Sequence, residues 1–235
     1  MRRARKARRA GGAPRTARPL GLGPRVLIRR VTRGDRAELL AMNRASRAFH
    51  HPWAFPPDTP AAFERYAARF ASPDFVQLAV CRREDGAIAG IVNVSHIVRG
   101  ALRSAYLGYY GNAALAGRGL MAEGLSLVVR HCFGPLGLHR VEANIQPGNR
   151  ASRILVRRLG FTREGFSRRY LEIGGRWRDH ERWALLEEYF RARGPTGGRE
   201  RRPRVRGASS ERRAREVPPR VRRASSPARG PASRP

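Results

Sequence analysis

The sequence lacks the residues on which several classes of protein depend. It has only two cysteines, Cys81 and Cys132, and both lie in apolar segments without the CxxC spacing of a zinc site. We therefore expect two reduced core residues in a cytoplasmic protein rather than a disulfide framework. No apolar run reaches the roughly 18 residues of a membrane helix, and no apolar segment follows the basic N-terminus as in a secretory signal. Neither a membrane protein nor a secreted one is expected.

Motifs for metal and nucleotide binding are also missing. HExxH and GxxxxGK[ST] do not occur in the chain. His50, His51 and His139 have no partners at metal-ligand spacing, and His96 does not stand in a nucleophile elbow. We expect structural or surface roles for these histidines, and no metal cofactor.

Lysine is nearly absent, and the positive charge is concentrated at both ends of the chain. The formal net charge is +31, and Lys6 is the only lysine among 49 basic residues. Residues 1–25 hold nine basic and no acidic residues, and residues 191–235 hold 15 basic and three acidic ones. Both ends are rich in Pro, Gly, Ser and Ala without periodic apolar positions. We predict two disordered tails, 1–25 and 191–235, around one domain at 26–190.

The tails allow two interpretations. Arginine-rich segments neutralise phosphates and release counterions, which predicts weak, salt-sensitive contact with RNA. The arginine bias also fits GC-rich coding and a start codon downstream of the first methionine, in which case the tails are solvated and dispensable.

The middle of the chain alternates between strand-like and helix-like segments, which predicts an α/β domain. A hairpin is expected at the "EDG" turn, and Asp58 or Thr59 is expected to cap a helix with Pro60 in its first turn. The periodicities predict strands at 26–31, 75–82, 87–98, 104–110 and 140–145 and on both sides of Gly174-Gly175, and helices at 37–45, 61–70, 120–129 and 149–159.

One glycine-containing stretch, "AGRGLMAEGL", lies between a predicted strand and a predicted helix. The first amides of a helix have no internal partners and lie at the positive end of its dipole, so they form an anion site. Gly117 and Gly119 keep no side chain between an anion and the backbone, and Arg118 adds a positive charge. GxGxxG is not completed, because Ala122 stands at the third glycine position. Taken alone, the stretch fits a phosphate loop or a plain helix start.

Further motifs resolve this ambiguity by resemblance. "AGRGLMAEGLSLVVRH", "GLHRVEANIQPGNRASRILVRRLGFTREG" and "YLEIGGRWRDH" resemble the Gcn5-related N-acetyltransferase (GNAT) superfamily, and within it the RimJ/RimL type of ribosomal-protein alanine N-acetyltransferases. The resemblance covers nearly all of 26–190 and neither tail. It implies a mixed, mostly antiparallel twisted sheet of about six to seven strands, splayed at the cofactor site and flanked by about four helices. It also implies acetyl-CoA as cosubstrate.

The resemblance assigns roles to specific residues. In this superfamily a Gln/Arg-x-x-Gly-x-Gly/Ala loop binds the pyrophosphate of acetyl-CoA through its amides. The chain departs from that pattern twice, with Ala116 for Gln or Arg and Met121 for Gly or Ala, and Arg118 is expected to compensate for Ala116. The residues implied in cofactor binding are Ala116, Gly117, Arg118, Gly119, Leu120 and Met121 in the loop, Leu107, Gly108 and Tyr109 through their backbone, and Asn149 and Ser152 at a helix start.

The chemistry needs little acid or base assistance. About a tenth of an α-amine is neutral at pH 7, and a thiolate leaves readily. By resemblance, Ser152 protonates the departing thiolate; its alternative role, like that of Asn149, is simply to start a helix. Glu142 and Glu172 are the candidate bases, although a strand position and a surface charge explain them as well.

The leading hypothesis is an N-acetyltransferase that acetylates the N-terminal amine, with alanine first, of a ribosomal or other protein. The acceptor would be met on the ribosome, with weak RNA contact through the tails. Two alternatives stay open: acetylation of a small amine or antibiotic, and a basic nucleic-acid-binding protein whose acetyltransferase domain is weakly active. Trp53 and Phe55 are expected either in the acceptor cleft or in the core, and the protein as a monomer or homodimer.

Overall fold

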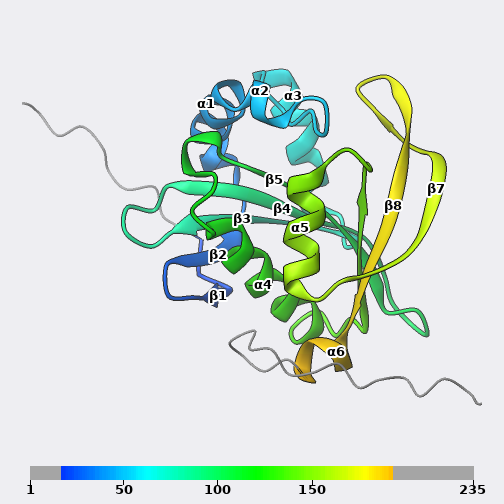
Figure 1. The fold of residues 1–235 in the computed structure, drawn as a ribbon. Helices are drawn as coiled ribbons and strands as arrows, with labels where there is room; N and C mark the ends of the chain where they lie inside the picture. The colour runs from blue at the N-terminus through cyan, green and yellow to red at the C-terminus, as the bar shows by residue number, and fades with distance from the viewer. Residues whose placement is uncertain (1–16, 193–235) are drawn as a thin grey trace, which may run out of the picture. The chain divides into compact units, whose positions relative to one another are not determined.

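An open sheet of eight strands organises the described part of the chain, residues 17–192, in this computed structural model (Figure 1). The strand order is β1-β2-β3-β4-β5-β6-β8-β7. Neighbours are antiparallel except β5 and β6, which are parallel. The predicted mixed, mostly antiparallel sheet is therefore confirmed. The strands are β1 Gly21–Leu22, β2 Val26–Arg30, β3 Phe75–Arg82, β4 Ile88–Val98, β5 Ser104–Gly111, β6 Arg140–Ile145, β7 Thr162–Ile173 and β8 Arg176–Leu186.

Six α-helices lie among the described residues, and four of them match the predicted ones. They are α1 Arg36–Ala45, α2 Arg47–His50, α3 Pro60–Ala67, α4 Leu120–Phe133, α5 Arg150–Leu159 and α6 Glu187–Ala192. Sequence periodicity did not find α2 and α6, because these helices are too short to show a helical period. Of the two caps predicted for α3, the structure has Thr59, whose Oγ1 accepts from the amide of Ala62 at 3.2 Å.

The folded domain begins earlier than predicted. Gly21 and Leu22, within the predicted N-terminal tail, pair with Ile28 and Leu27 of β2, and the amide of Leu20 donates to the carbonyl of Ile28 at 2.8 Å. A two-residue strand has no alternation by which sequence could identify it. The predictions for residues 1–16 and 193–235 lie outside the described residues.

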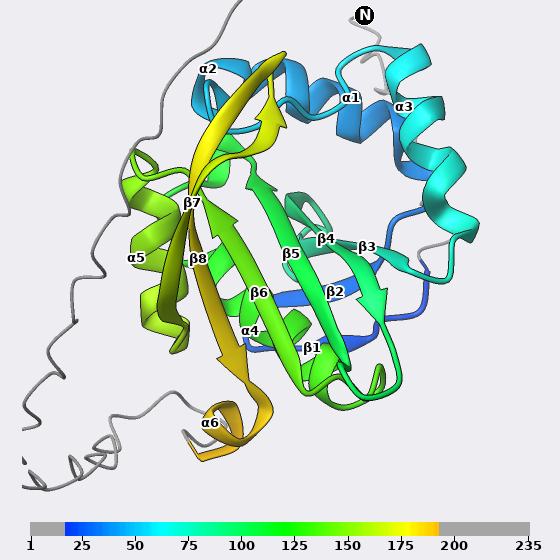
Figure 2. The same ribbon diagram turned by 90° about the vertical axis from the view of Figure 1, so that its right-hand side faces the viewer.

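Helices cover both faces of the sheet, as Figure 2 shows. Along β3, Leu78 and Val80 belong to the core that packs under α4 and α5, whereas Ala79 and Cys81 belong to the core under α1 and α3. This explains why nearly all of β3 is buried. Cys81 and Cys132 are buried and form no disulfide, as predicted.

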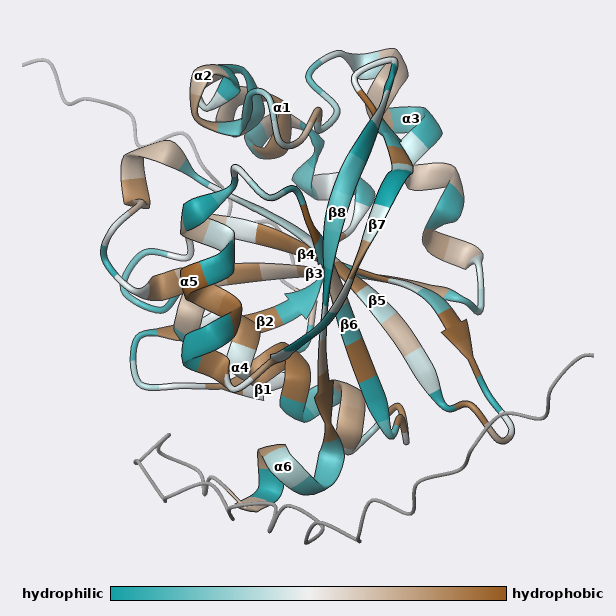
Figure 3. Cartoon of the chain, turned by 45° about the vertical axis from the view of Figure 1, so that its right-hand side comes forward, coloured by the Kyte–Doolittle hydropathy of each residue, from teal (hydrophilic) through white to brown (hydrophobic). Residues whose placement is uncertain are grey.

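The sheet is more polar at its β7–β8 edge. Most residues of β7 are exposed, and Figure 3 colours much of this hairpin as hydrophilic. The tight Gly174-Gly175 turn that joins the two strands has φ of 60° and 72°, which explains the glycine pair. No helix among residues 17–192 is long and apolar enough to span a membrane.

The parallel pair β5–β6 determines where the functional site lies. The chain leaves the end of β5, passes through α4 and returns as β6, and then leaves the end of β6 for α5. Because the two strands run the same way, α4 and α5 both begin on the side of the sheet where β5 and β6 have their C-terminal ends (Figure 1). Helix N-termini and strand ends are thereby gathered at one place.

Candidate active site

β5 and β6 separate after three paired positions. Ser104, Ala105 and Tyr106 pair with Arg140, Val141 and Glu142, and no further pair follows. The rest of β5 is still bound to β4 on its other side, up to Gly111. The sheet therefore opens along Leu107–Gly111, as the resemblance implied, and leaves backbone groups of β5 without a strand partner.

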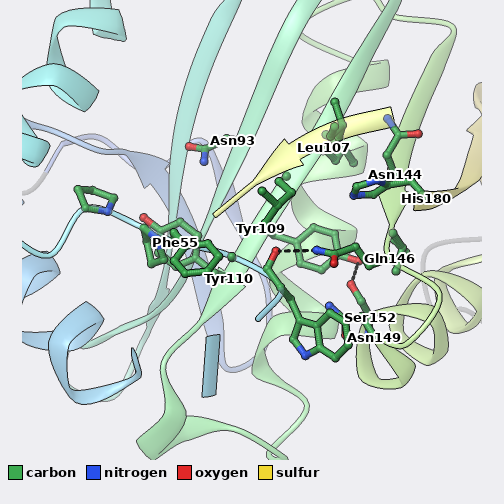
Figure 4. Close-up of a pocket in the computed structure, with 18 of the residues that line it drawn as sticks. Phe55, Asn93, Leu107, Tyr109, Tyr110, Asn144, Gln146, Asn149, Ser152 and His180 are labelled. Carbon is green, nitrogen blue, oxygen red and sulfur yellow. Dashed lines mark hydrogen bonds between the residues drawn. The ribbon is translucent and has the colours of Figure 1, made fainter. Parts of the chain in front are cut away.

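A pocket of about 390 Å³ fills this opening. Figure 4 shows its side chains converging from both sides of the gap. The lining comes from five parts of the chain: the segment before α3, α3 and the residues that follow it, the strands β4, β5 and β6, the start of α5, and the β7–β8 hairpin. Its residues are Trp53, Ala54, Phe55, Pro56, Pro57, Tyr66, Arg69, Asn93, Leu107, Gly108, Tyr109, Tyr110, Asn144, Ile145, Gln146, Asn149, Ser152, Leu171, Ile173 and His180.

Two predicted residues at the start of α5 line the pocket. The side chain of Asn149 accepts from the amide of Ser152 at 3.1 Å, so Asn149 caps the helix and lines the pocket at once. The Ser152 hydroxyl lies 2.6 Å from the hydroxyl of Tyr109 (Figure 4). Burial raises the pKa of Tyr109 to about 12, although the bond with Ser152 lowers it. Tyr109 is therefore neutral at pH 7 and can supply a proton to Ser152.

The glycine loop has the backbone of an anion site. Gly117 and Gly119 have φ of 76° and 77°, and Gly119 is the N-cap of α4. No described residue accepts a hydrogen bond from the amides of 117–119. Nothing lies within 4 Å of where a Cβ of Gly117 would be. These amides thus lack a backbone acceptor among the described residues, and their binding of a phosphate stays a prediction.

The side chains of the next two loop residues point into the core. Leu120 is 5% exposed, and Met121 packs against Gly90 of β4 at a place where a Cβ on Gly90 would collide. Gly90 thus explains how a large residue replaces the small one of the family pattern. If Leu120 and Met121 bind a ligand, they do so only through their backbone.

A cation that the sequence analysis assigned to the tail lies at this loop. The Arg25 guanidinium donates to the carbonyl of Arg118 at 2.9 Å and lies 3.3 Å from the Cβ position of Gly119. Glu123 holds it there, accepting from Arg25 Nε at 2.9 Å. Burial favours a higher pKa for Glu123, but the bonds from Arg25 and Val26 outweigh it and lower the pKa. Arg25 is therefore held beside the loop by Glu123, whose carboxylate balances its charge, and its guanidinium, like the side chain of Arg118, is exposed.

The structure speaks against both candidate bases. Glu142 lies on β6 where the strands are still paired, and it does not line the pocket. Its carboxylate accepts from Arg140 Nε at 2.7 Å, and Arg140 also binds Glu164. Glu172 is exposed, between two pocket residues that alternate with it along β7. Glu142 is thus a residue of a paired strand and Glu172 a surface charge, as the alternative explanations had it.

Trp53 and Phe55 line the pocket, as one of the two predictions had it. Trp53 packs against the backbone of Gly148, where a Cβ would lie 2.8 Å from its ring, and Phe55 packs against Gly174, where a Cβ would lie 2.6 Å from its ring. The segment before α3 thereby reaches both the start of α5 and the β7–β8 turn. Phe55 is 59% exposed and lies toward the mouth of the pocket.

Several residues of the pocket wall carry no signal in the sequence. His180 and Asn144 come from β8 and β6, and Arg69 follows α3 with its guanidinium 3.5 Å above the ring of Phe75. The predicted structural roles of other histidines hold: His50 Nε2 lies 2.7 Å from the carbonyl of Gly111, and His139 pairs with Glu188.

Comparison with known proteins agrees with this geometry. The sequence model of the acetyltransferase (GNAT) domain matches residues 25–162. A protein named probable N-acetyltransferase YjcK, from Bacillus subtilis, is 36% identical over 121 residues, which are 52% of this chain and 67% of that protein. The uS5-alanine N-acetyltransferase of Escherichia coli is 43% identical over 98 residues, 42% of this chain and 50% of that protein. The chain thus matches only about half the length of this second relative.

Solved structures share the fold. Mycobacterium smegmatis RimJ in complex with CoA-disulfide is 29% identical with a TM-score of 0.64, over 69% of this chain and 82% of that one. A spermidine N-acetyltransferase from Vibrio cholerae, with CoA and spermine, is 20% identical with a TM-score of 0.62, over 72% of this chain and 99% of that one, and shows the fold alone. The family match, the opened sheet and the glycine loop together establish that the chain belongs to the acetyltransferase (GNAT) family, among relatives and structural neighbours of the RimJ/RimL ribosomal-protein N-acetyltransferase type.

Proposed function

We propose that this protein transfers the acetyl group of acetyl-CoA to the N-terminal α-amine, with alanine first, of a ribosomal or other cytoplasmic protein. The observation that carries the proposal is the pocket between β5 and β6, whose wall joins Ser152 to Tyr109 at 2.6 Å. The name of the Escherichia coli relative, a uS5-alanine N-acetyltransferase, supports the acceptor class.

The described residues fit acetyl-CoA. The unbonded amides of 117–119, the N-terminus of α4 and the Arg25 guanidinium suit the pyrophosphate. The gap between β5 and β6 suits the pantetheine chain. The backbone of Leu107, Gly108 and Tyr109 suits the thioester carbonyl, in the manner of an oxyanion hole. The cosubstrate supplies an activated acetyl group, and the chain's own groups orient it.

Ser152 is the group that protonates the departing thiolate. Its hydroxyl passes a proton to sulfur and takes one from the hydroxyl of Tyr109, 2.6 Å away, and Tyr109 regains its proton from solvent. The contribution is modest, because a thiol with a pKa near 8.5 leaves readily without an acid. Positioning of the amine against the thioester accounts for more of the rate.

The charge of the pocket favours a peptide over a small polycation. No Asp or Glu lies among the described residues that line it, and Arg69 is the one Arg or Lys in that wall. A spermidine or an aminoglycoside carries several positive charges and needs carboxylates to offset the loss of its water. An N-terminal α-amine carries one charge at most, and about a tenth of it is neutral at pH 7.

An acceptor panel tests this proposal. Purified full-length protein is incubated with acetyl-CoA and equal concentrations of Ala-, Ser- and Thr-starting peptides, spermidine and an aminoglycoside, and products are read by mass spectrometry. We expect kcat/KM for the Ala-starting peptide to exceed that for either polycation at least about 100-fold, a difference of about 2.7 kcal/mol in transition-state binding. Acetylation of a polycation with the peptides unmodified would show that the acceptor has been assigned wrongly.

A further inference from the structure

Two hydrogen-bond acceptors lie in the pocket wall made by β6 and β8, apart from the Ser152 side. Asn144 Oδ1 is buried and has no partner among the described residues. His180 is 2% exposed and lines the same pocket. Asn144 pairs with Arg182, two positions from His180 on the adjacent strand, so both side chains lie on one face. Figure 4 shows them side by side, across the pocket from Phe55.

The surroundings of His180 fix which ring nitrogen is free. Its Nδ1 lies 2.9 Å from the carbonyl of Arg178, and a carbonyl only accepts, so Nδ1 carries a proton. Burial lowers the pKa of His180 and outweighs both the Arg178 carbonyl and the Asp179 charge, which raise it. The ring is therefore neutral at pH 7. Its lone pair is on Nε2, to which no group in residues 17–192 is hydrogen-bonded.

The groups around the His180 ring do not restore its positive charge. Tyr170 of β7 meets the ring with centroids 6.1 Å apart, and the Asp179 carboxylate is occupied by the amide of Arg169 at 2.8 Å. The remaining titratable groups on the pocket wall are neutral tyrosines and one arginine: Tyr66, Tyr109 and Tyr110, and Arg69. No carboxylate among the described residues that line the pocket competes with Nε2 as a proton acceptor.

We propose that Asn144 Oδ1 and His180 Nε2 form the seat of the acceptor amine and that His180 is the catalytic base. The proposal rests on the proposed function and names groups of the same site. An amine that enters the pocket donates one N–H to Asn144 and one to His180. As its nitrogen attacks the thioester carbonyl, the C–N bond forms and the surplus proton passes to Nε2. The C–S bond then breaks, and the thiolate takes its proton from Ser152. His180 returns its proton to solvent.

The test compares His180→Gln with Glu142→Gln in the full chain. We expect His180→Gln to lower kcat about 100-fold at pH 7.5, with KM for acetyl-CoA within about threefold of wild type. The wild-type kcat should fall with decreasing pH below the pKa of His180, which lies under the ordinary value of about 6.5, and His180→Gln should lack this fall. Glu142→Gln, which removes the base candidate outside the pocket, should keep the wild-type pH profile and kcat.

Two acceptor substrates separate a failure of the proposed function from a failure of the amine site. The rates are measured with both an Ala-starting peptide and a small primary amine, since the seat receives the amine whatever carries it. A wild-type protein that acetylates only the small amine defeats the proposed function, whereas the loss in His180→Gln still supports the seat. A His180→Gln kcat above a third of wild type, with an unchanged pH profile, overturns the seat.

A second measurement covers loss of folding. If His180→Gln unfolds, the wild-type imidazole is followed by ¹⁵N NMR. We expect the ring to be neutral and protonated at Nδ1 at pH 7. Its Nε2 resonance should shift when an Ala-starting peptide binds. A protonated ring at pH 7 contradicts the proposal.

Discussion

Replacing Gly119 by aspartate is expected to weaken coenzyme A binding about 100-fold. A Cβ at this position lies 3.3 Å from Arg25 Nη2, so the new carboxylate would bind Arg25 and lie beside the unbonded amides of the loop. A negative charge about 5 Å from a phosphate costs about 3 kcal/mol at an effective dielectric constant of 20. That energy corresponds to roughly a hundredfold rise in Kd.

Asparagine at the same position is the matched control. Asp and Asn tolerate a positive φ better than other residues do, and the φ of Gly119 is 77°. Gly119→Asn adds the same volume without the charge, so we expect it to raise Kd roughly tenfold at most. Calorimetric titration with coenzyme A measures both variants. Equal losses would mean that shape rather than charge governs the loop, and a Gly119→Asp protein that binds like wild type would show that no phosphate lies there.

Replacing Arg29 by methionine is expected to cost about 3–5 kcal/mol of unfolding free energy at pH 7. Arg29 donates two hydrogen bonds to Asp35, at 2.7 and 2.9 Å, and both side chains are only 7% exposed. Asp35 also accepts from the amide of Thr32 at 2.7 Å, so the pair joins β2 to the start of α1. Without Arg29 a carboxylate stays buried and unpaired. Urea unfolding followed by circular dichroism measures the loss.

The double variant Arg29→Met/Asp35→Leu tests the cause. It removes the charge along with its partner, so it should recover more than half of the loss. A double variant as unstable as Arg29→Met would mean that packing, rather than the stranded charge, explains the effect.

The pH dependence gives an independent check of the same pair. Burial favours a higher pKa for Asp35, but bonds from Arg29 and Thr32 outweigh it and lower the pKa. The stabilisation that ionised Asp35 contributes to the folded state is therefore complete above the unfolded pKa of about 3.9. It is lost as the pH falls through the lower pKa of the folded state. Arg29→Met removes the hydrogen bond that does most to lower the pKa of Asp35. The difference in stability between wild type and variant should accordingly shrink between pH 7 and pH 3.

Sequence periodicity found the elements whose burial repeats along the chain. β6 alternates between buried and half-buried residues, and α5 has its cap and its C-terminal glycine in sequence. The elements that were missed are too short to carry a pattern of their own. β1 exists because it pairs with β2, and the four residues of α2 are too few to show a helical period.

The same distinction applies to the site. Asn149 and Ser152 could be predicted because their roles are local to one helix start. Arg25 could not, because one basic residue in a basic run is distinguished only by Glu123, 98 positions away. Glu142 was a poor candidate for a reason visible in sequence: Arg140 shares its face of the strand and binds it. His180 needed the structure, because a carbonyl fixes its tautomer and burial fixes its charge.

The central claim is that the pocket acetylates an α-amine at a protein N-terminus, and one measurement tests it most directly. A peptide that begins with alanine and contains internal lysines is incubated with the protein and acetyl-CoA, and the acetyl group is located by fragment-ion mass spectrometry. The α-amine has a pKa near 8 and a lysine amine near 10.4, so the α-amine offers far more of the neutral nucleophile at pH 7. We predict one acetyl group, on the N-terminal alanine. Acetylation of the lysines with the N-terminus left free would contradict the account.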